Sequence, residues 1–300
     1  MNQKRKKAYI ALGLNVLIWG ASAPIVKWAL PFTTPYRWLF YRYLIAAPLT
    51  FPIIIYYLIK SKKLIKKVFI IVLLELIGTT AVLAILYQGL SRTSAIDASL
   101  IATSGPIFVI VGGIIFLKEK EEKREWIGLF VALFGSIIVS IEPLLLKSNI
   151  AGDSSFIGNS LVFLQNIVWA IYLIIIKKVY KDIPKIFIGA ISFSVGLVSF
   201  YILSLLTSDV PLLLDLSSPQ VTISVIYMGI FGSIIGLTLY LYGHNLIEAS
   251  EAVLFTYLQP IIAVPIAYIL LSDNLTIYSL MGMLLIAFGV YLAEIRTRRV

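Results

Sequence analysis

Glu75 is the first residue whose type and position could do chemistry, because it lies between Leu74 and Leu76 in a long apolar run. A charged side chain at the centre of a membrane helix costs roughly 2.5–3.5 kcal/mol on insertion scales. Two interpretations are open for Glu75, which has Thr79 one helical turn later. It binds a cationic substrate group or carries a coupling proton, or it is a protonated side chain bonded to a neighbouring helix.

Neutral polar and aromatic residues repeat on matching helix faces. Two faces 150 residues apart each carry an amide and an indole at i and i+4, with a hydroxyl-bearing residue at i+7. They are Asn15, Trp19 and Ser22, and Gln165, Trp169 and Tyr172. With Gln259, these residues would suit a polar, aromatic-lined cavity. Hydrogen bonds between helices, worth about 0.6 kcal/mol each, are the alternative.

Three other ionisable residues lie within or near apolar runs. Lys27 is close to the end of its predicted helix, where its amine can reach the membrane surface. Arg42 lies deeper, and it either pairs with a helix end or an acid such as Asp97, or contacts a substrate. His244 is the single histidine, and it is either a proton relay or an interfacial side chain.

The clusters that catalysis and metal binding need are missing from the sequence. The chain has no cysteine and one histidine, so thiolate sites are excluded and a serine nucleophile finds little support. Neither an HExxH segment nor a Walker A loop occurs. We therefore expect no catalytic residue, no bound metal and no cofactor.

The composition identifies the class of protein. Apolar residues make up 60% of the 300 residues and charged residues 13%, whereas soluble domains are about 45–50% apolar and about 25% charged. A soluble enzyme, a nucleic-acid-binding protein and a disordered chain are therefore excluded. Because about 20 apolar residues cross a bilayer, we predict an all-α integral membrane protein with ten transmembrane helices. The predicted spans are 8–29, 36–59, 68–90, 95–117, 125–141, 158–177, 186–206, 220–245, 251–271 and 276–295.

Basic residues gather on one side of these predicted spans. If the N-terminus is cytoplasmic, 20 of the 25 Lys and Arg residues fall in cytoplasmic segments. By the positive-inside rule, both termini are then cytoplasmic and the protein is a multi-pass protein of the cell membrane. A signal peptide ending at Ala21-Ser22-Ala23 is the alternative for the first span, but Pro24 directly afterwards would hinder cleavage.

The chain contains an internal repeat. Residues 87–140 align without gaps on 241–294, and the proline and two glycines of each segment coincide. The pairs are Pro106 with Pro260, Gly128 with Gly282, and Gly135 with Gly289. Each repeat holds five predicted spans, an odd number, so the second must enter from the opposite side. We predict two inverted five-helix repeats, at 8–141 and 158–295, joined by an extracytoplasmic linker at 142–157, with Pro106 and Pro260 as hinges.

The order of several loose motifs resembles the EamA-type members of the drug/metabolite transporter superfamily, over nearly the whole chain. The motifs are Trp19–Ala23, Lys27, Arg42-Tyr43, Tyr87, Thr93–Ala95, Pro106, Leu117–Glu119, Trp169–Tyr172 and Gln259-Pro260. Asp273 departs from the family pattern, which usually has a glutamate there. The resemblance implies a fold of two five-helix domains.

The resemblance also implies a secondary active transporter, often an exporter, of small polar metabolites, amino acids or drug-like compounds. Its expected partners are the small-molecule substrate, the lipid bilayer, and a coupling proton or counter-substrate, with no nucleic acid. From the residues, the expected substrate- or ion-binding set is Glu75, Asn15, Trp19, Thr79, Gln165, Trp169, Tyr172 and Gln259. A flippase of lipids or lipid-linked headgroups is the alternative, and a membrane enzyme is disfavoured.

Overall fold

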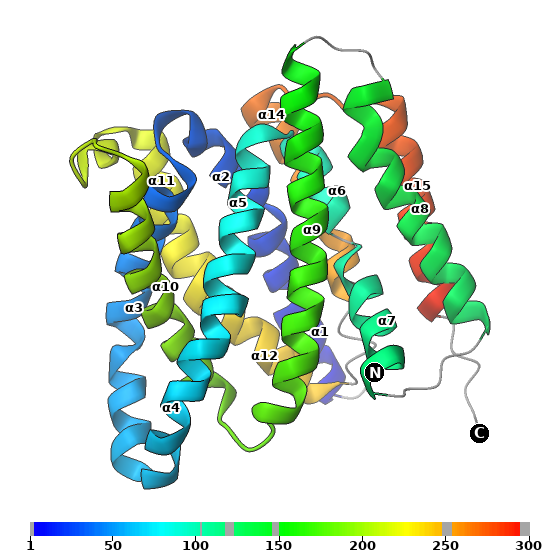
Figure 1. The fold of residues 1–300 in the computed structure, drawn as a ribbon. Helices are drawn as coiled ribbons and strands as arrows, with labels where there is room; N and C mark the ends of the chain where they lie inside the picture. Colours follow the sequence, from blue (N-terminus) through cyan, green and yellow to red (C-terminus); the bar gives the residue numbers. More distant parts are fainter. Residues whose placement is uncertain (1–2, 103, 118–122, 146–149, 248–253, 295–300) are drawn as a thin grey trace.

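The computed structural model describes residues 3–102, 104–117, 123–145, 150–247 and 254–294 as helices joined by short turns (Figure 1). Six of its helical segments are long and apolar enough to cross a membrane, and four shorter apolar helices accompany them. The prediction of an all-α membrane protein is confirmed, whereas the count of ten spans stays a prediction.

The N-terminal half contains α1 (Gln3–Gly20), α2 (Ser22–Ala29), α3 (Pro35–Lys60), α4 (Lys62–Glu75), α5 (Val82–Arg92), α6 (Ala95–Ala102), α7 (Gly105–Leu117) and α8 (Lys123–Leu145). The C-terminal half contains α9 (Ile150–Val179), α10 (Lys185–Thr207), α11 (Pro219–Ile226), α12 (Gly236–Leu246), α14 (Gln259–Leu271) and α15 (Ile277–Glu294).

Two of the long helices contain a π-helical segment that hydropathy does not reveal. One is η2 (Leu76–Ala81), between α4 and α5, and the other is η4 (Tyr227–Ile235), between α11 and α12. The backbone N–H of the first residue after each segment bonds to a carbonyl five residues earlier, which widens the turn. Residues 76–81 lie 154 positions before 230–235, so the two π-segments occupy equivalent places in the sequence repeat. Such widened turns are frequent at functional sites.

The helices pack in pairs that repeat with the two halves exchanged. In the packing of α5 on α9, a long helix of the N-terminal half contacts the first helix of the C-terminal half, and in that of α1 on α12 the roles are reversed. The packing of α7 on α9 likewise has its counterpart in that of α14 on α1. The equivalent helices α3 and α10 pack side by side and run in opposite directions in Figure 1.

Equivalent glycines allow α8 and α15 to approach closely. A Cβ atom on Gly135 would lie 2.8 Å from the carbonyl oxygen of Gly282, and one on Gly289 would lie 2.5 Å from that of Gly128. These contacts are with backbone atoms, which cannot move aside as a flexible side chain can. The repeated glycines therefore serve helix packing, as small residues commonly do in membrane proteins.

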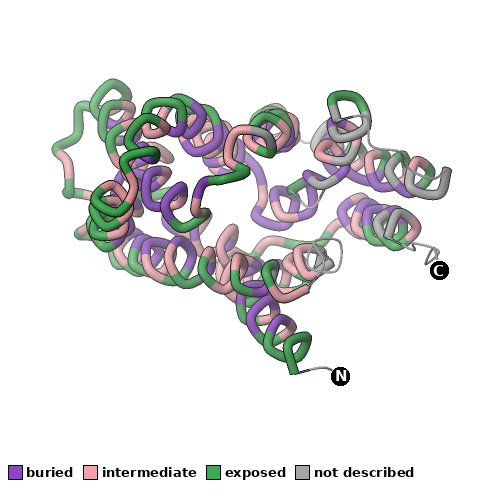
Figure 2. Tube along the Cα trace, turned by 90° about the horizontal axis from the view of Figure 1, so that it is seen from below, coloured by how far each residue is buried: buried purple, intermediate pink, exposed green. Residues whose placement is uncertain are grey.

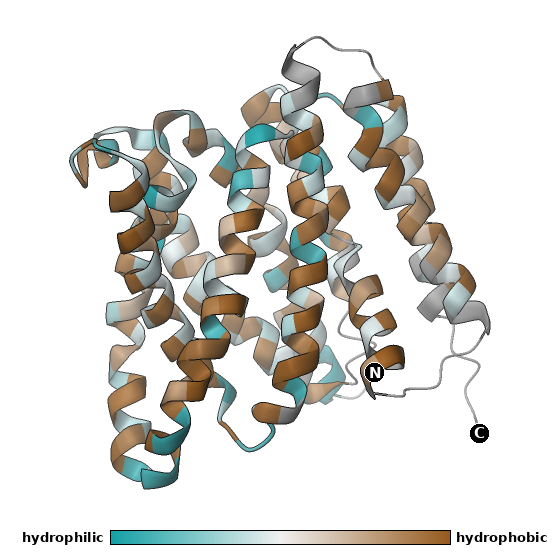
Figure 3. Cartoon of the chain, in the orientation of Figure 1, coloured by the Kyte–Doolittle hydropathy of each residue, from teal (hydrophilic) through white to brown (hydrophobic). Residues whose placement is uncertain are grey.

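The surface has the polarity of a membrane protein. In Figure 2, buried residues face the neighbouring helices and exposed residues face outwards. Many of these exposed residues are large and apolar, such as Ile59, Phe69 and Ile269. In Figure 3 the turn between α3 and α4, at the lower end, is hydrophilic, while the helix bodies are mostly apolar. An apolar exterior of this kind is suited to lipid rather than to water.

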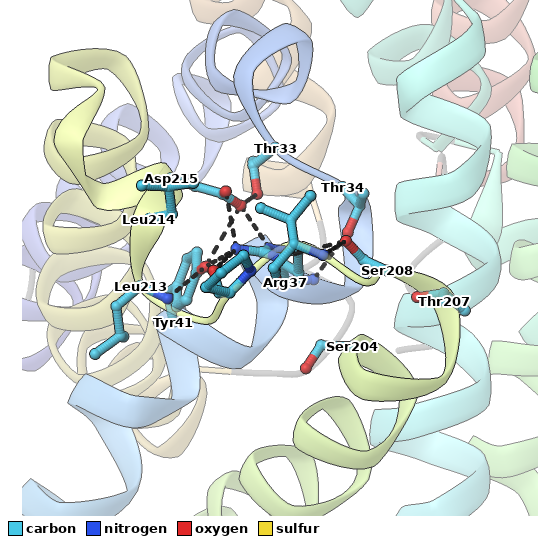
Figure 4. A network of polar contacts seen from close by, with 12 residues as sticks. Thr33, Thr34, Arg37, Tyr41, Ser204, Thr207, Ser208, Leu213, Leu214 and Asp215 are labelled. Atoms are coloured by element: carbon cyan, nitrogen blue, oxygen red, sulfur yellow. Dashed lines mark hydrogen bonds and ion pairs between the residues drawn. The ribbon is translucent and has the colours of Figure 1, made fainter.

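The loop between α10 and α11 is held against the start of α3 by a buried arginine (Figure 4). Arg37, only 1% exposed, forms an ion pair with Asp215 through two hydrogen bonds, from Nε at 2.7 Å and from Nη2 at 2.9 Å. Its remaining N–H groups reach the carbonyl oxygens of Val210 and Pro211 and the hydroxyl groups of Ser208 and Tyr41. Every donor of this guanidinium is therefore engaged, and the pair fixes the loop.

Replacing Arg37 with glutamine is expected to destabilise the fold by about 3–5 kcal/mol, because it leaves the Asp215 carboxylate buried without its partner. Thermal unfolding of the purified protein in detergent would measure the loss. Asp209→Asn is the matched control, since Asp209 is exposed in the same loop. An unchanged unfolding temperature in Arg37→Gln would contradict the structural role of the pair.

Candidate functional site

Glu75, the last residue of α4, is 2% exposed and accepts four hydrogen bonds from hydroxyl groups. Oε1 accepts from Tyr172 at 2.6 Å and from Tyr180 at 2.8 Å. Oε2 accepts from Thr79 and from Ser192, both at 2.8 Å. We call these five residues the Glu75 cluster. A carboxylate has about four lone-pair sites, so the cluster fills the acceptor capacity of Glu75.

The Glu75 cluster joins the two halves of the chain. Glu75 and Thr79 belong to the N-terminal half, whereas Tyr172 lies on α9, Tyr180 in the turn after it, and Ser192 on α10. Glu75 lies eight residues, or about 12 Å, along α4 from Lys67, the last lysine of its first turns. The carboxylate thus cross-links the halves within the apolar part of α4.

The π-segment η2 explains how Glu75 and Thr79 meet α9. Glu75 directly precedes η2, and Thr79 lies within it. Gly78, between them, has no side chain, and a Cβ atom there would lie 2.3 Å from the ring of Tyr172. The glycine therefore makes the space through which the tyrosine hydroxyl reaches the carboxylate.

Asn15 and Trp19 form a separate group, against the other π-segment. The side-chain amide of Asn15 donates to the carbonyl oxygen of Gly236, and the indole N–H of Trp19 to that of Gly232, both at 2.9 Å. The Trp19 ring also packs on Tyr240 at 5.1 Å between ring centroids. In the present conformation these two residues bind the backbone of η4 and α12 rather than face Glu75.

The other predicted binding residues differ in whether they have partners. Trp169, 36% exposed, stacks on Tyr172 with the ring centroids 5.3 Å apart and so extends the Glu75 cluster. Gln165 is only 7% exposed, yet its amide has no hydrogen-bond partner among the described residues. The side chain of Gln259, at the start of α14, likewise forms no hydrogen bond within the described part of the chain. Both amides remain available to a ligand.

The two predicted hinge prolines lie at the starts of helices, not in their interiors. Pro106 is the second residue of α7, and α6 has already ended at Ala102. Pro260 is the second residue of α14, which follows η5 (Leu254–Leu258). A first-turn residue needs no intrahelical N–H bond, so proline is tolerated there. Each proline therefore begins a helix just after a break instead of kinking a continuous one.

The remaining ionisable residues have specific partners. Lys27 donates to the carbonyl oxygens of Leu90 and Ser91, both at 2.9 Å, and so caps the end of α5. Asp97 does not pair with Arg42, because its carboxylate accepts a hydrogen bond from Ser279. The side chain of His244 lies outside the described residues.

Sequence reasoning missed several partners. Tyr180 and Ser192 are ordinary surface or helix residues by type, and their distance from Glu75 in the sequence gives no signal. It also missed Glu142, a buried carboxyl that contacts the hydroxyl groups of Thr276 and Ser279, both at 2.7 Å. The near-apolar surroundings of Glu142 at the end of α8 were the one available signal.

Comparison with known proteins agrees with this architecture. A model described as the EamA-like transporter family matches residues 6–141 and 156–295. An uncharacterized transporter, YyaM, of Bacillus subtilis (strain 168) is 26% identical over 296 residues, covering 97% of this chain and 94% of that protein. An uncharacterized transporter of Archaeoglobus fulgidus is 22% identical over 289 residues, covering 95% and 96%. A solved crystal structure shares the fold, with a TM-score of 0.65 and 13% identity over 100% of this chain and 98% of the other. The chain therefore belongs to the EamA-like transporter family, which supports membrane transport, rather than catalysis, as its function.

Proposed function

We propose that this protein is a secondary active transporter that exports small polar metabolites, amino acids or drug-like compounds. Its two five-helix halves, about 8–141 and 158–295, would act as inverted repeats that expose a shared site to each side of the membrane in turn. The exchanged packing of α5 on α9 and of α1 on α12 supports this arrangement. The opposite directions of α3 and α10 support the inversion.

The observation that carries the proposal is the Glu75 cluster. Alternating access requires contacts between the halves that break and form again. Three of the four hydroxyl donors to Glu75 come from the C-terminal half, so a relative movement of the halves would remove them. A proton or a cationic substrate group that reaches the carboxylate would replace these donors and release the contact.

Unpartnered polar groups support a substrate site at the same interface. A polar group in a membrane interior is tolerated when it is bonded within the protein or lines a water-filled cavity. The Gln165 amide and the buried Thr80 hydroxyl oxygen have no partner among the described residues. Gln165 lies one turn from Trp169 on α9, and Thr80 lies next to Thr79 in η2. These groups would bind the polar atoms of a substrate.

Glu75→Gln is expected to reduce export on the order of tenfold. The amide nitrogen cannot accept the two hydrogen bonds that the replaced oxygen accepts, and hydrogen bonds to charged groups are worth about 1.5–3 kcal/mol. Untargeted mass spectrometry would compare the medium of cells producing the wild type, Glu75→Gln, Asp209→Asn or no protein, at equal membrane abundance. The exposed-site variant Asp209→Asn should export like the wild type.

The outcomes separate the parts of this proposal. Accumulation of one metabolite class that fades with Glu75→Gln supports both the exporter and its carboxylate. Accumulation that is equal in Glu75→Gln keeps the exporter and removes the role of Glu75. If no class accumulates with the wild type, the exporter assignment is wrong.

The proposed orientation has both termini in the cytoplasm, and it is testable because the chain has no cysteine. Ser61 lies in the lysine-rich turn between α3 and α4, and Ser217 in the loop between α10 and α11. A membrane-impermeant maleimide should label Ser217→Cys in intact cells, because that loop would face outwards. Ser61→Cys should react only after the cells are disrupted. The reverse pattern would invert the topology.

A further inference from the structure

Arg42 is a positively charged side chain inside the helix bundle that the proposed mechanism does not use. Its Nε donates to the Ser233 hydroxyl oxygen at 2.9 Å, and Nη1 donates to the Tyr87 hydroxyl oxygen at 3.0 Å. The guanidinium carbon also lies 5.4 Å from the centroid of the Tyr43 ring. Ser233, Tyr87 and Tyr43 are buried and come from η4, α5 and α3, so the guanidinium is enclosed by three elements.

Arg37, five residues earlier in α3, provides an internal comparison. All donors of Arg37 are engaged, and Asp215 neutralises its charge. Arg42 uses two of its five N–H groups, and both partners are neutral hydroxyl groups. Within the described residues, no carboxylate lies at ion-pair distance from Arg42. Hydroxyl groups orient a guanidinium without neutralising it, so the site contains a cation and three free donors.

The depth of Arg42 in the bundle makes its lack of a carboxylate partner among the described residues informative. Arg42 is seven residues, or about 10 Å, along α3 from Pro35. A charge at membrane depth almost always pairs with another group or marks the path of a substrate. Because Arg42 has no pairing acid in the described chain, the second explanation applies.

A second unpartnered group lies at a similar depth. Gly89 of α5 packs against Gly158 and Val162 of α9, and Gly78, eleven residues earlier, packs against Tyr172. Lower numbers in one segment thus meet higher numbers in the other, so the two segments run antiparallel. Tyr87, which holds Arg42, therefore lies within about one helical turn (~5 Å) of the level of Gln165. Gln165 therefore lies at a level similar to that of Arg42. Tyr87 itself faces α3, where it contacts Arg42 and Trp38, while Gly89 faces α9.

We propose that Arg42 binds the carboxylate group of the transported substrate, with Tyr87 and Ser233 positioning the guanidinium. The planar guanidinium fork matches a carboxylate by two parallel hydrogen bonds, and its three free N–H groups suffice for that contact. The inference rests on the proposed function and narrows its substrate class to small carboxylates, including amino acids. The carboxylate would supply the counter-charge that the described residues do not provide.

Binding to the purified full-length protein tests this proposal. Trp38 stacks on Tyr87, with the ring centroids 5.2 Å apart, so tryptophan fluorescence should respond when an anion engages Arg42. The probes are the standard amino acids and short mono- and dicarboxylates, each compared with its amide. At least one carboxylate should bind saturably, and its amide should bind at least about tenfold more weakly, because the charge-assisted pair is lost. Thermal stabilisation of the protein by the same compound is the second measurement.

Substitutions at Arg42 and Tyr87 test whether these residues form the binding site. Arg42→Lys should weaken carboxylate binding about tenfold or more, because an ammonium cannot form the two-point contact. Tyr87→Phe keeps the ring against Trp38 but removes the positioning hydroxyl, so it should weaken binding about threefold, a typical loss for one hydrogen bond. Arg92→Lys is the matched control at an exposed arginine and should bind like the wild type. Arg42→Lys and Tyr87→Phe are conservative changes, and thermal unfolding of each variant would check that it still folds.

Four results would overturn the proposal. Equal carboxylate binding by the wild type and Arg42→Lys would remove Arg42 from the site. Amides that bind as tightly as their acids would remove the charge requirement. If no carboxylate binds while cells still export a neutral or cationic metabolite, the carboxylate proposal fails and the exporter proposal stands. If export is absent as well, both proposals fail.

Discussion

The interior of a bilayer offers no hydrogen-bond partners, so the protein itself must satisfy each polar group that it places there. This constraint makes the described chain helical and accounts for most of its polar contacts. Arg37 meets it completely, through Asp215 and the loop between α10 and α11. Glu75 meets it with four hydroxyl groups. Within the described residues Gln165 forms no side-chain hydrogen bond and Arg42 forms two, to neutral hydroxyl groups, and the proposed ligand contacts rest on these observations.

The two halves share a framework but differ in chemistry. Their π-segments occupy equivalent positions, and Thr79 in η2 corresponds to Ser233 in η4, 154 residues later. Glu75 corresponds to Gly229, where a Cβ atom would lie 2.9 Å from the Cβ of Ile45, so a carboxylate has no room there. One π-segment thus directly follows a carboxylate held by hydroxyl groups, and the other contacts an arginine through Ser233. This difference gives opposite charges to two related places on the interface.

Hydropathy and length predict an all-α membrane protein, but they do not predict the breaks inside the expected spans, such as the one between α6 and α7 within 95–117. The sequence also identifies Glu75, since a single acid in an apolar run is rare. It does not predict the π-segments, because no local motif marks them. Their surroundings, such as the Tyr172 ring against Gly78, come from distant parts of the chain. Nor does the sequence show that Arg37 is buried and paired with Asp215. The partners that distinguish Arg37 from Arg42 are up to 191 residues away, and only the tertiary fold brings them together.

In the proposed mechanism, the Glu75 cluster breaks and forms again as the halves move. Spin labels on a Lys63→Cys, Lys181→Cys double variant would follow the distance between α4 and the turn after α9, because both lysines are exposed and no other cysteine is present. Double electron–electron resonance in proteoliposomes should show two distance populations, and adding Glu75→Gln should increase the longer one. A single distance that Glu75→Gln leaves unchanged would contradict the account.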